Sequence, residues 1–201
     1  MRLFLSTLMP LCALALAACG PSGTEVQNNS GSGTATDTVA AAGTANGTTP
    51  AAAGGDRLIM ELKGGKVVIK LRPDLAPGHV ERVKLLVKEG FYNGHKFHRV
   101  IPGFMAQTGD PTGTGAGGSS YPDLKAEFTS AAFERGTVGA ARTGNPNSAN
   151  SQFFICLAHA PHLNGQYTVW GQVVEGMQFV DQIAKGEPPP KPDTIIKMSL
   201  E

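Results

Sequence analysis

The succession of short apolar runs between Asp56 and Glu201 limits the fold more than any other feature of the sequence. Most of these runs are separated by turns rich in Gly. Runs of this length, bounded by turn residues, are typical of β-strands rather than helices. The predicted strands cover residues 58–62, 67–71, 97–101, 105–107, 137–142, 152–157, 167–174 and 194–200.

Two segments have helical spacing instead. Pro77 suits the first turn of a helix, and Val80, Val83 and Val87 then fall on one helical face. Residues 176–184 form the second helix candidate. Many short strands with only two isolated helices favour a closed antiparallel barrel over alternating βαβ units.

The segment from Asp56 to Glu201 has the size of one domain with a full core. Its charge is nearly balanced, with 16 Lys and Arg against 14 Asp and Glu, and the basic residues form no stripe. We therefore predict no nucleic-acid partner.

Arg99 is the residue that most needs an explanation. It lies in the stretch Lys96–Gln107, where five large apolar side chains surround this single guanidinium. Arginine keeps its charge and carries five donors, so it must find acceptors or hold its head group in solvent. By this stretch alone, Arg99 is either a functional cation beside an apolar site or a side chain that snorkels from a strand edge.

Four sequence blocks together resemble the cyclophilin family of peptidyl-prolyl isomerases. They are Phe97-His-Arg-Val-Ile-Pro-Gly-Phe-Met-Ala-Gln107, Gly109-Asp-Pro-Thr-Gly-Thr-Gly115, Ser151-Gln-Phe-Phe-Ile155 and Leu163-Asn-Gly-Gln-Tyr167. The blocks follow one another in the family's order, and the resemblance runs from about Arg57 to Leu200. It implies a mainly β fold, a closed eight-stranded antiparallel β-barrel capped by two α-helices, with the site on the outer face of the barrel.

The same resemblance implies a set of site residues. It makes Arg99 and Gln107 the catalytic pair and assigns the proline pocket to Phe104, Met105, Phe154 and Leu163. Further substrate contacts are implied at Gly113, Ala141, Arg142, Gln152 and Tyr167. Because neighbours on a strand face opposite sides, we expect Phe153 in the core and Phe154 in the pocket.

The sequence departs from the family pattern at three positions near the expected site. Tyr167 stands where many eukaryotic members have histidine, and it keeps an aromatic wall with a polar tip. His162 stands where those members have the tryptophan that favours cyclosporin, so we expect weak cyclosporin binding. Arg142 replaces a common asparagine, which leaves the substrate preference there open.

Rotation about an X-Pro bond moves no proton, so we expect neither cofactor nor metal.

Three other features suggest alternatives. His159 and His162 could suggest a metal, although no Cys, Asp or Glu nearby completes a ligand set. Residues 109–118 are rich in Gly but lack the Gly-Lys-Ser or Gly-Lys-Thr of a phosphate loop. The run Pro188–Pro192 is either a stiff connector or an extended ligand for another groove.

The first 18 residues have the pattern of a secretory signal: Arg2, an apolar run too short to span a membrane, and small residues at the end. The sequence Leu16-Ala17-Ala18-Cys19 resembles the lipobox of bacterial lipoproteins, which implies cleavage before Cys19 and lipid on its sulfur. The alternative is an ordinary signal cut after a small residue. Residue 20 is Gly rather than the Asp linked to inner-membrane retention, so we expect an outer-membrane anchor facing the periplasm.

Residues 19–55 connect this anchor to the domain. From Gly20 to Gly55, 26 of 36 residues are Gly, Ala, Ser or Thr. This segment has too few large apolar side chains to offset the loss of conformational entropy when a chain becomes ordered. As a flexible coil this linker would reach about 30 to 36 Å. Cys156 is the single thiol left in the mature chain, and we expect it to be buried and inert.

These observations predict a membrane-tethered isomerase, a monomer, that acts on X-Pro bonds of extracytoplasmic proteins and assists their folding. Proline-containing polypeptides would be its partners. A binding module that holds such segments as a chaperone or scaffold, with incidental catalysis, is the alternative. A surface adhesin or structural lipoprotein would leave the pattern around Arg99 without an explanation.

Overall fold

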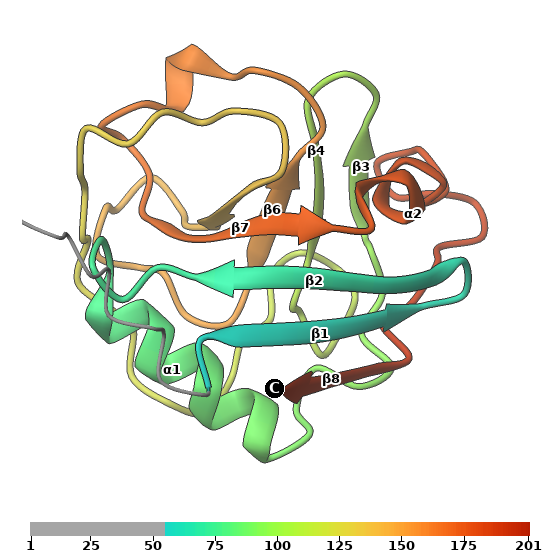
Figure 1. The fold of residues 1–201 in the computed structure, drawn as a ribbon, viewed down its shortest axis with the longest axis horizontal. Helices are drawn as coiled ribbons and strands as arrows, with labels where there is room; N and C mark the ends of the chain where they lie inside the picture. Colours follow the sequence, from blue (N-terminus) through green and yellow to red (C-terminus); the bar gives the residue numbers. More distant parts are fainter. Residues whose placement is uncertain (1–54) are drawn as a thin grey trace, which may run out of the picture. The chain divides into compact units, whose positions relative to one another are not determined.

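The computed structural model describes residues 55–201 (Figure 1). The predicted signal peptide, Cys19 and all but the last residue of the predicted linker lie outside the described residues. The elements are β1 (Arg57–Leu62), β2 (Gly65–Leu71), α1 (Pro77–Lys88), β3 (Arg99–Ile101), β4 (Met105–Thr108), β5 (Thr137–Ala140), β6 (Phe153–Cys156), the 3₁₀ turn η1 (Pro161–Leu163), β7 (Val169–Glu175), α2 (Met177–Asp181) and β8 (Lys197–Leu200). In this part of the chain, neither helix has the length and apolar character needed to cross a membrane.

The eight strands form one antiparallel sheet in the order β3-β4-β6-β5-β7-β2-β1-β8. The first two predicted strands are confirmed and form a hairpin: β1 and β2 pair from Arg57 with Lys70 to Leu62 with Gly65, leaving Lys63 and Gly64 as the turn. The mainly β prediction and the two helices are confirmed as well.

The predicted closure of the barrel is not confirmed, because the sheet is curled but open. Its two edge strands, β3 and β8, do not pair with each other. The chain segments beside them meet through an isolated bridge between Lys96 and Thr194 and a few hydrogen bonds, such as that from Gly94 N–H to Ile195 O at 2.7 Å. Irregular backbone, rather than a ladder of paired strands, therefore spans the gap between β3 and β8.

Several elements are shorter than the apolar runs predict. β5 ends at Ala140 and β7 begins at Val169, so Ala141, Arg142 and Tyr167 lie just outside the strands. An apolar run marks burial, whereas a strand also needs a partner for each backbone group, so the two can end at different residues. At the pocket this leaves irregular backbone beside the sheet.

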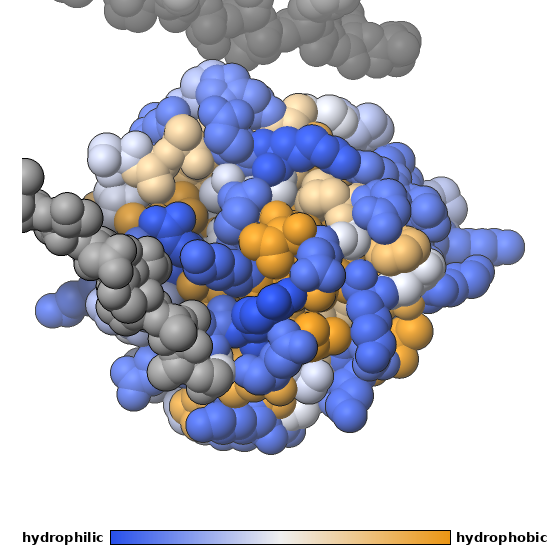
Figure 2. Space-filling model, in the orientation of Figure 1, coloured by the Kyte–Doolittle hydropathy of each residue, from blue (hydrophilic) through white to orange (hydrophobic). Residues whose placement is uncertain are grey.

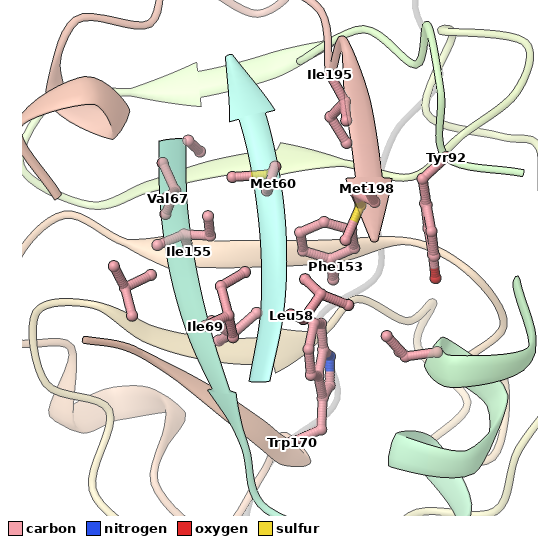
Figure 3. Close-up of a cluster of buried hydrophobic side chains, with 14 of the residues drawn as sticks. Leu58, Met60, Val67, Ile69, Tyr92, Phe153, Ile155, Trp170, Ile195 and Met198 are labelled. Carbon is pink, nitrogen blue, oxygen red and sulfur yellow. The ribbon is translucent and has the colours of Figure 1, made fainter. Parts of the chain in front are cut away.

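The core fills the inside of the curled sheet. Figure 3 shows Leu58, Met60, Ile69, Phe153 and Trp170 converging from four strands, β1, β2, β6 and β7, and each is at most 1% exposed. Helix α1 packs beside β7 and β8, while α2 packs beside β2, toward the opposite end of this strand in Figure 1. With the interior filled by side chains, a binding site has to lie on the outer face.

The surface seen in Figure 2 is mostly hydrophilic, with apolar areas separated by polar residues. The large apolar side chains that are exposed in the described domain belong to separate elements: Leu85, Phe128, Val174 and Ile196. Single exposed apolar residues of this kind are common on soluble domains and do not mark a docking face.

Candidate active site

A cavity of about 110 Å³ lies on the outer face of the sheet, and we call it the apolar cavity because most of its lining residues are apolar or aromatic. It is lined by Arg99, Phe104, Met105, Gln107, Ala141, Arg142, Phe154, Leu163 and Tyr167. These are nine of the eleven site residues expected in the domain, and they come from β3, β4, β6, η1 and the segments beside β5 and β7. The fold thus gathers residues up to 68 positions apart around one small space.

The strand register explains how these side chains meet. Arg99 lies opposite Gln107, and Gln107 lies opposite Phe154, so the three form a row across β3, β4 and β6. Gly139 continues the row on β5, opposite Phe154. A Cβ atom at Gly139 would lie 2.6 Å from Cζ of Phe154, so the missing side chain leaves room for that ring. Phe153 packs in the main core instead, which confirms the expected alternation.

Arg99 is one of the two arginines that line this cavity, the other being Arg142. The Arg99 side chain is 42% exposed and its Nε–H donates to Oε2 of Glu187 at 2.8 Å. Glu187 comes from the loop after α2, 88 residues further along the chain. Gln107, the other residue of the expected catalytic pair, bonds elsewhere: its side chain donates to Oε1 of Gln152 at 2.9 Å.

A second, polar cavity of about 350 Å³ adjoins the first. Both are lined by Gln107, Ala141 and Arg142, so they share one edge. Gln152, which was expected at the site, lines the polar cavity and donates from Nε2 to the carbonyls of Gly115 and Gly117. A peptide seated in the apolar cavity could therefore continue along a surface of fixed donors and acceptors.

Arg142 stands at the shared edge and is tightly held. Its guanidinium lies 4.4 Å from the centre of the Tyr167 ring and donates to the carbonyls of Gln166 and Thr143, each at 2.9 Å. Tyr167 in turn meets Phe154 edge to face, with ring centres 5.7 Å apart. Two of the three positions that depart from the family pattern, Arg142 and Tyr167, thus form one stacked pair beside the cavity.

The Gly-rich loop after β4 is organised around Asp110, which is 1% exposed. The Asp110 carboxylate accepts from the backbone N–H groups of Thr112, Thr114 and Gly115 and from the Thr112 hydroxyl. Burial by itself raises the pKa of Asp110, but these hydrogen bonds outweigh it and hold the pKa well below its ordinary value. An internal carboxylate therefore occupies the N–H groups of this loop.

Gly113 belongs to the same loop but lines neither cavity. A Cβ atom there would meet the side chain of Lys96 at 3.2 Å. Residues 115–119 line the polar cavity in its place. The geometry gives no support to the expected contact between Gly113 and substrate.

The remaining candidates have local partners. His159 Nδ1 lies 3.0 Å from Oε2 of Glu134, and the ring of His162 lies 5.2 Å from that of Phe104. In residues 55–201, no three His, Cys, Asp or Glu side chains come together as a metal site. Cys156 is buried, and burial raises the pKa of its thiol to about 12, as expected of an inert cysteine.

Glu187 is the site neighbour that sequence reasoning missed. No local pattern marks it, since it is a single acidic residue before a run of prolines. Its partner becomes visible only when the loop after α2 is placed beside β3.

The eight-stranded curled sheet, with an arginine and a cluster of apolar side chains on its outer face, has the architecture expected of a cyclophilin. Residues 57–200 match the family described as cyclophilin type peptidyl-prolyl cis-trans isomerase/CLD, and the chain belongs to this family. It is an enzyme, a peptidyl-prolyl cis-trans isomerase.

Individual relatives of the chain are peptidyl-prolyl cis-trans isomerases as well. A probable peptidyl-prolyl cis-trans isomerase of Brucella suis biovar 1 (strain 1330) is 55% identical over 167 residues, which cover 75% of this chain and 85% of that protein. Peptidyl-prolyl cis-trans isomerase B of Bacillus subtilis (strain 168) is 42% identical over 125 residues, covering 62% of this chain and 87% of that protein.

Solved structures give the same result for the fold. The cyclophilin AquaCyp293 from Hirschia baltica has a TM-score of 0.68 at 28% identity, covering 72% of this chain and 73% of that chain. A Cryptosporidium parvum cyclophilin, crystallised in the presence of the dipeptide Ala-Pro, has a TM-score of 0.67 at 28% identity and covers 72% of this chain and 98% of that chain.

Proposed function

We propose that this enzyme isomerises X-Pro bonds of extracytoplasmic proteins and assists their folding, with Arg99 as the catalytic residue. One observation carries the assignment of Arg99: its side chain lines the same cavity as Phe104, Met105 and Phe154. A cation at the rim of an apolar space that fits a small ring is what the reaction needs.

The chemistry follows from the amide bond. Delocalisation of the prolyl nitrogen's lone pair into the carbonyl creates a rotation barrier of about 18 to 20 kcal/mol. A donor that meets this nitrogen as it becomes pyramidal stabilises the twisted state over both planar states. The Arg99 guanidinium supplies such a donor, and no nucleophile or general base is required.

A rate gain of about five powers of ten requires about 7 kcal/mol. By analogy with oxyanion sites, one preorganised donor supplies about 3 to 4 kcal/mol. We assign the remainder to the apolar seat for the proline ring and to contacts with the flanking peptide. In this proposal Ala141 and Arg142 meet the residue before proline, and Gln107 and Gln152 hold the chain along the polar cavity. The choice of the dipeptide Ala-Pro for crystallisation of the Cryptosporidium parvum relative agrees with a proline-containing substrate.

The proposed location rests on the N-terminal sequence. Cleavage before Cys19 and acylation of its sulfur would hold the domain at a membrane surface, since each buried methylene of an acyl chain contributes about 0.8 kcal/mol. We expect intact-mass analysis of the mature protein to show loss of residues 1–18 and a gain of several acyl chains. The C19S variant should leave the membrane fraction. A mature chain without lipid would identify an ordinary secretory signal instead.

The folding role needs its own experiment. We would measure refolding of a secreted protein whose slow phase is X-Pro isomerisation, with and without the mature enzyme. Acceleration that disappears in the R99A variant supports the proposal. If R99A supports client folding in cells as well as the wild type does, the alternative function of a Pro-peptide-binding chaperone is favoured.

The cavity also predicts the response to cyclosporin. His162, which is exposed and lies against Phe104, takes the place of the family's tryptophan. A large aromatic anchor is a frequent hot spot in binding, so we expect H162W to tighten inhibition by about tenfold or more. The matched control is H159W, three positions away and beside Glu134, which should leave inhibition unchanged. Wild-type inhibition as tight as that of tryptophan-bearing members would contradict this prediction.

A further inference from the structure

The carboxylate of Glu187 holds the guanidinium of Arg99 at the rim of the apolar cavity. The Nε–H of Arg99 donates to Oε2 of Glu187 at 2.8 Å. Among residues 55–201, this is the one hydrogen-bond partner of the Arg99 side chain. Because the contact uses Nε, the four N–H groups on the two Nη atoms remain available to a substrate.

The backbone that carries Glu187 is fixed to the strand that carries Arg99. Val100 N–H donates to Gly186 O at 2.8 Å, and Gly186 N–H donates back to Val100 O at 2.9 Å. These bonds join the residue after Arg99 to the residue before Glu187. The two long side chains therefore start from backbone positions that are already set side by side.

The loop around Glu187 has little freedom to move away. Gly186 has a φ of +144°, and a Cβ atom there would lie 2.7 Å from Cα of Pro189, so the chain turns closely on itself at this point. Pro189 is buried, and Ala184 N–H donates to the carboxylate of Asp193 on the far side of the loop. The carboxylate of Glu187 is thus presented from an anchored loop rather than from a loose one.

We propose that Glu187 is a positioning residue of the isomerase: it orients the guanidinium of Arg99 so that its outer N–H groups face the prolyl nitrogen. This inference rests on the proposed catalytic role of Arg99. A half-exposed arginine without such a partner samples many rotamers, and ordering it upon substrate binding costs free energy. A carboxylate that fixes Nε removes part of this cost before the substrate arrives.

The same contact contributes little to the stability of the fold. The side chains of Arg99 and Glu187 are 42% and 51% exposed, and ion pairs in such a setting are weakly stabilising because water screens them. An effect of Glu187 on catalysis can therefore be measured without unfolding the domain.

The test compares E187A and E187Q with the wild type in the mature protein, using an X-Pro peptide. We expect E187A to lower kcat by about 5- to 10-fold with KM within about twofold, because orientation acts in the transition state more than in ground-state binding. E187Q keeps an acceptor for Nε–H and should lose less. The matched control is E175Q, which breaks a comparable exposed pair with Arg57 away from both cavities and should match the wild type.

A double-mutant cycle separates positioning from a merely structural role. In an R99A background, E187A should have no further effect on kcat. The ¹⁵Nε–Hε resonance of Arg99 should also shift or broaden in E187A and persist in E175Q. Equal losses in both backgrounds, wild-type kcat in E187A, or a rise in kcat would each overturn the inference. If R99A itself retains full activity, the proposed role of Arg99 fails instead.

Discussion

Replacing Arg99 with alanine is expected to lower kcat/KM for an X-Pro peptide by about two to three powers of ten. The change removes the one donor that the proposal places at the prolyl nitrogen, and loss of a preorganised donor costs about 3 to 4 kcal/mol of transition-state stabilisation. The apolar cavity keeps its other lining residues, so peptide affinity should remain within a few-fold. Exchange spectroscopy on a proline peptide measures both quantities in one sample.

Two further variants sharpen this prediction. R99K keeps the charge but loses the planar fork and the Nε–H bonded to Glu187, so we expect it to recover only part of the activity. R135A is the matched control, because Arg135 also forms an exposed pair, with Asp181, but does not line either cavity. R99A activity within threefold of the wild type would exclude Arg99 as the catalytic residue.

Local patterns in the sequence are sufficient to predict much of the fold. The β1–β2 hairpin follows from two short apolar runs on either side of a Gly pair, and α1 follows from a proline at its start with valines on one face. Closure of the sheet could not be predicted in this way. It depends on whether the irregular segments around Lys96 and Thr194 pair as strands, and that is decided by the path of the whole chain.

The site likewise has some features that local sequence predicts and others that depend on the path of the whole chain. The alternation that sends Phe153 inward and Phe154 outward is a local property, and the resemblance named the residues that surround the cavity. The contacts of Gln107 with Gln152 and of Arg99 with Glu187 join residues 45 and 88 positions apart. Such contacts depend on register and loop placement, for which a single sequence holds no direct signal.

A second large effect is expected at the start of α1, where Glu127 supplies the cap that the helix itself lacks. The N-cap residue, Ala76, has no side-chain acceptor. Instead the Glu127 carboxylate accepts from the N–H groups of Gly78 and His79, each at 3.0 Å, and from Nδ1 of His79 at 2.5 Å. A carboxylate at this end also interacts favourably with the helix dipole.

We expect E127A to lower the free energy of unfolding by about 2 to 4 kcal/mol, because it leaves two helix N–H groups and a buried imidazole without their acceptor. Urea denaturation followed by circular dichroism measures this change. E134A is the matched control: Glu134 also faces a histidine, His159, but both side chains are more than half exposed. Its effect should stay within about 0.5 kcal/mol.

The stability that His79 and Glu127 contribute at the start of α1 should depend on pH. Burial lowers the pKa of His79, and the bond to Glu127 only partly offsets this, so the imidazole is neutral at pH 7 and donates from Nδ1. Burial by itself raises the pKa of Glu127, but the bonds from His79 and from the two backbone N–H groups outweigh it and lower the pKa. In both cases the unfolded chain takes up the proton first, so stability falls as the pH falls.

The loss should begin near pH 6.5, the ordinary pKa of histidine, and continue below about pH 4.3, the ordinary pKa of glutamate. E127Q separates the two steps. Its deficit relative to the wild type should be present at neutral pH and should shrink below about pH 4.3, as the wild-type carboxyl takes up a proton as well. A deficit that stays constant from pH 7 to pH 3 would mean that the charge of Glu127 does not stabilise the start of α1.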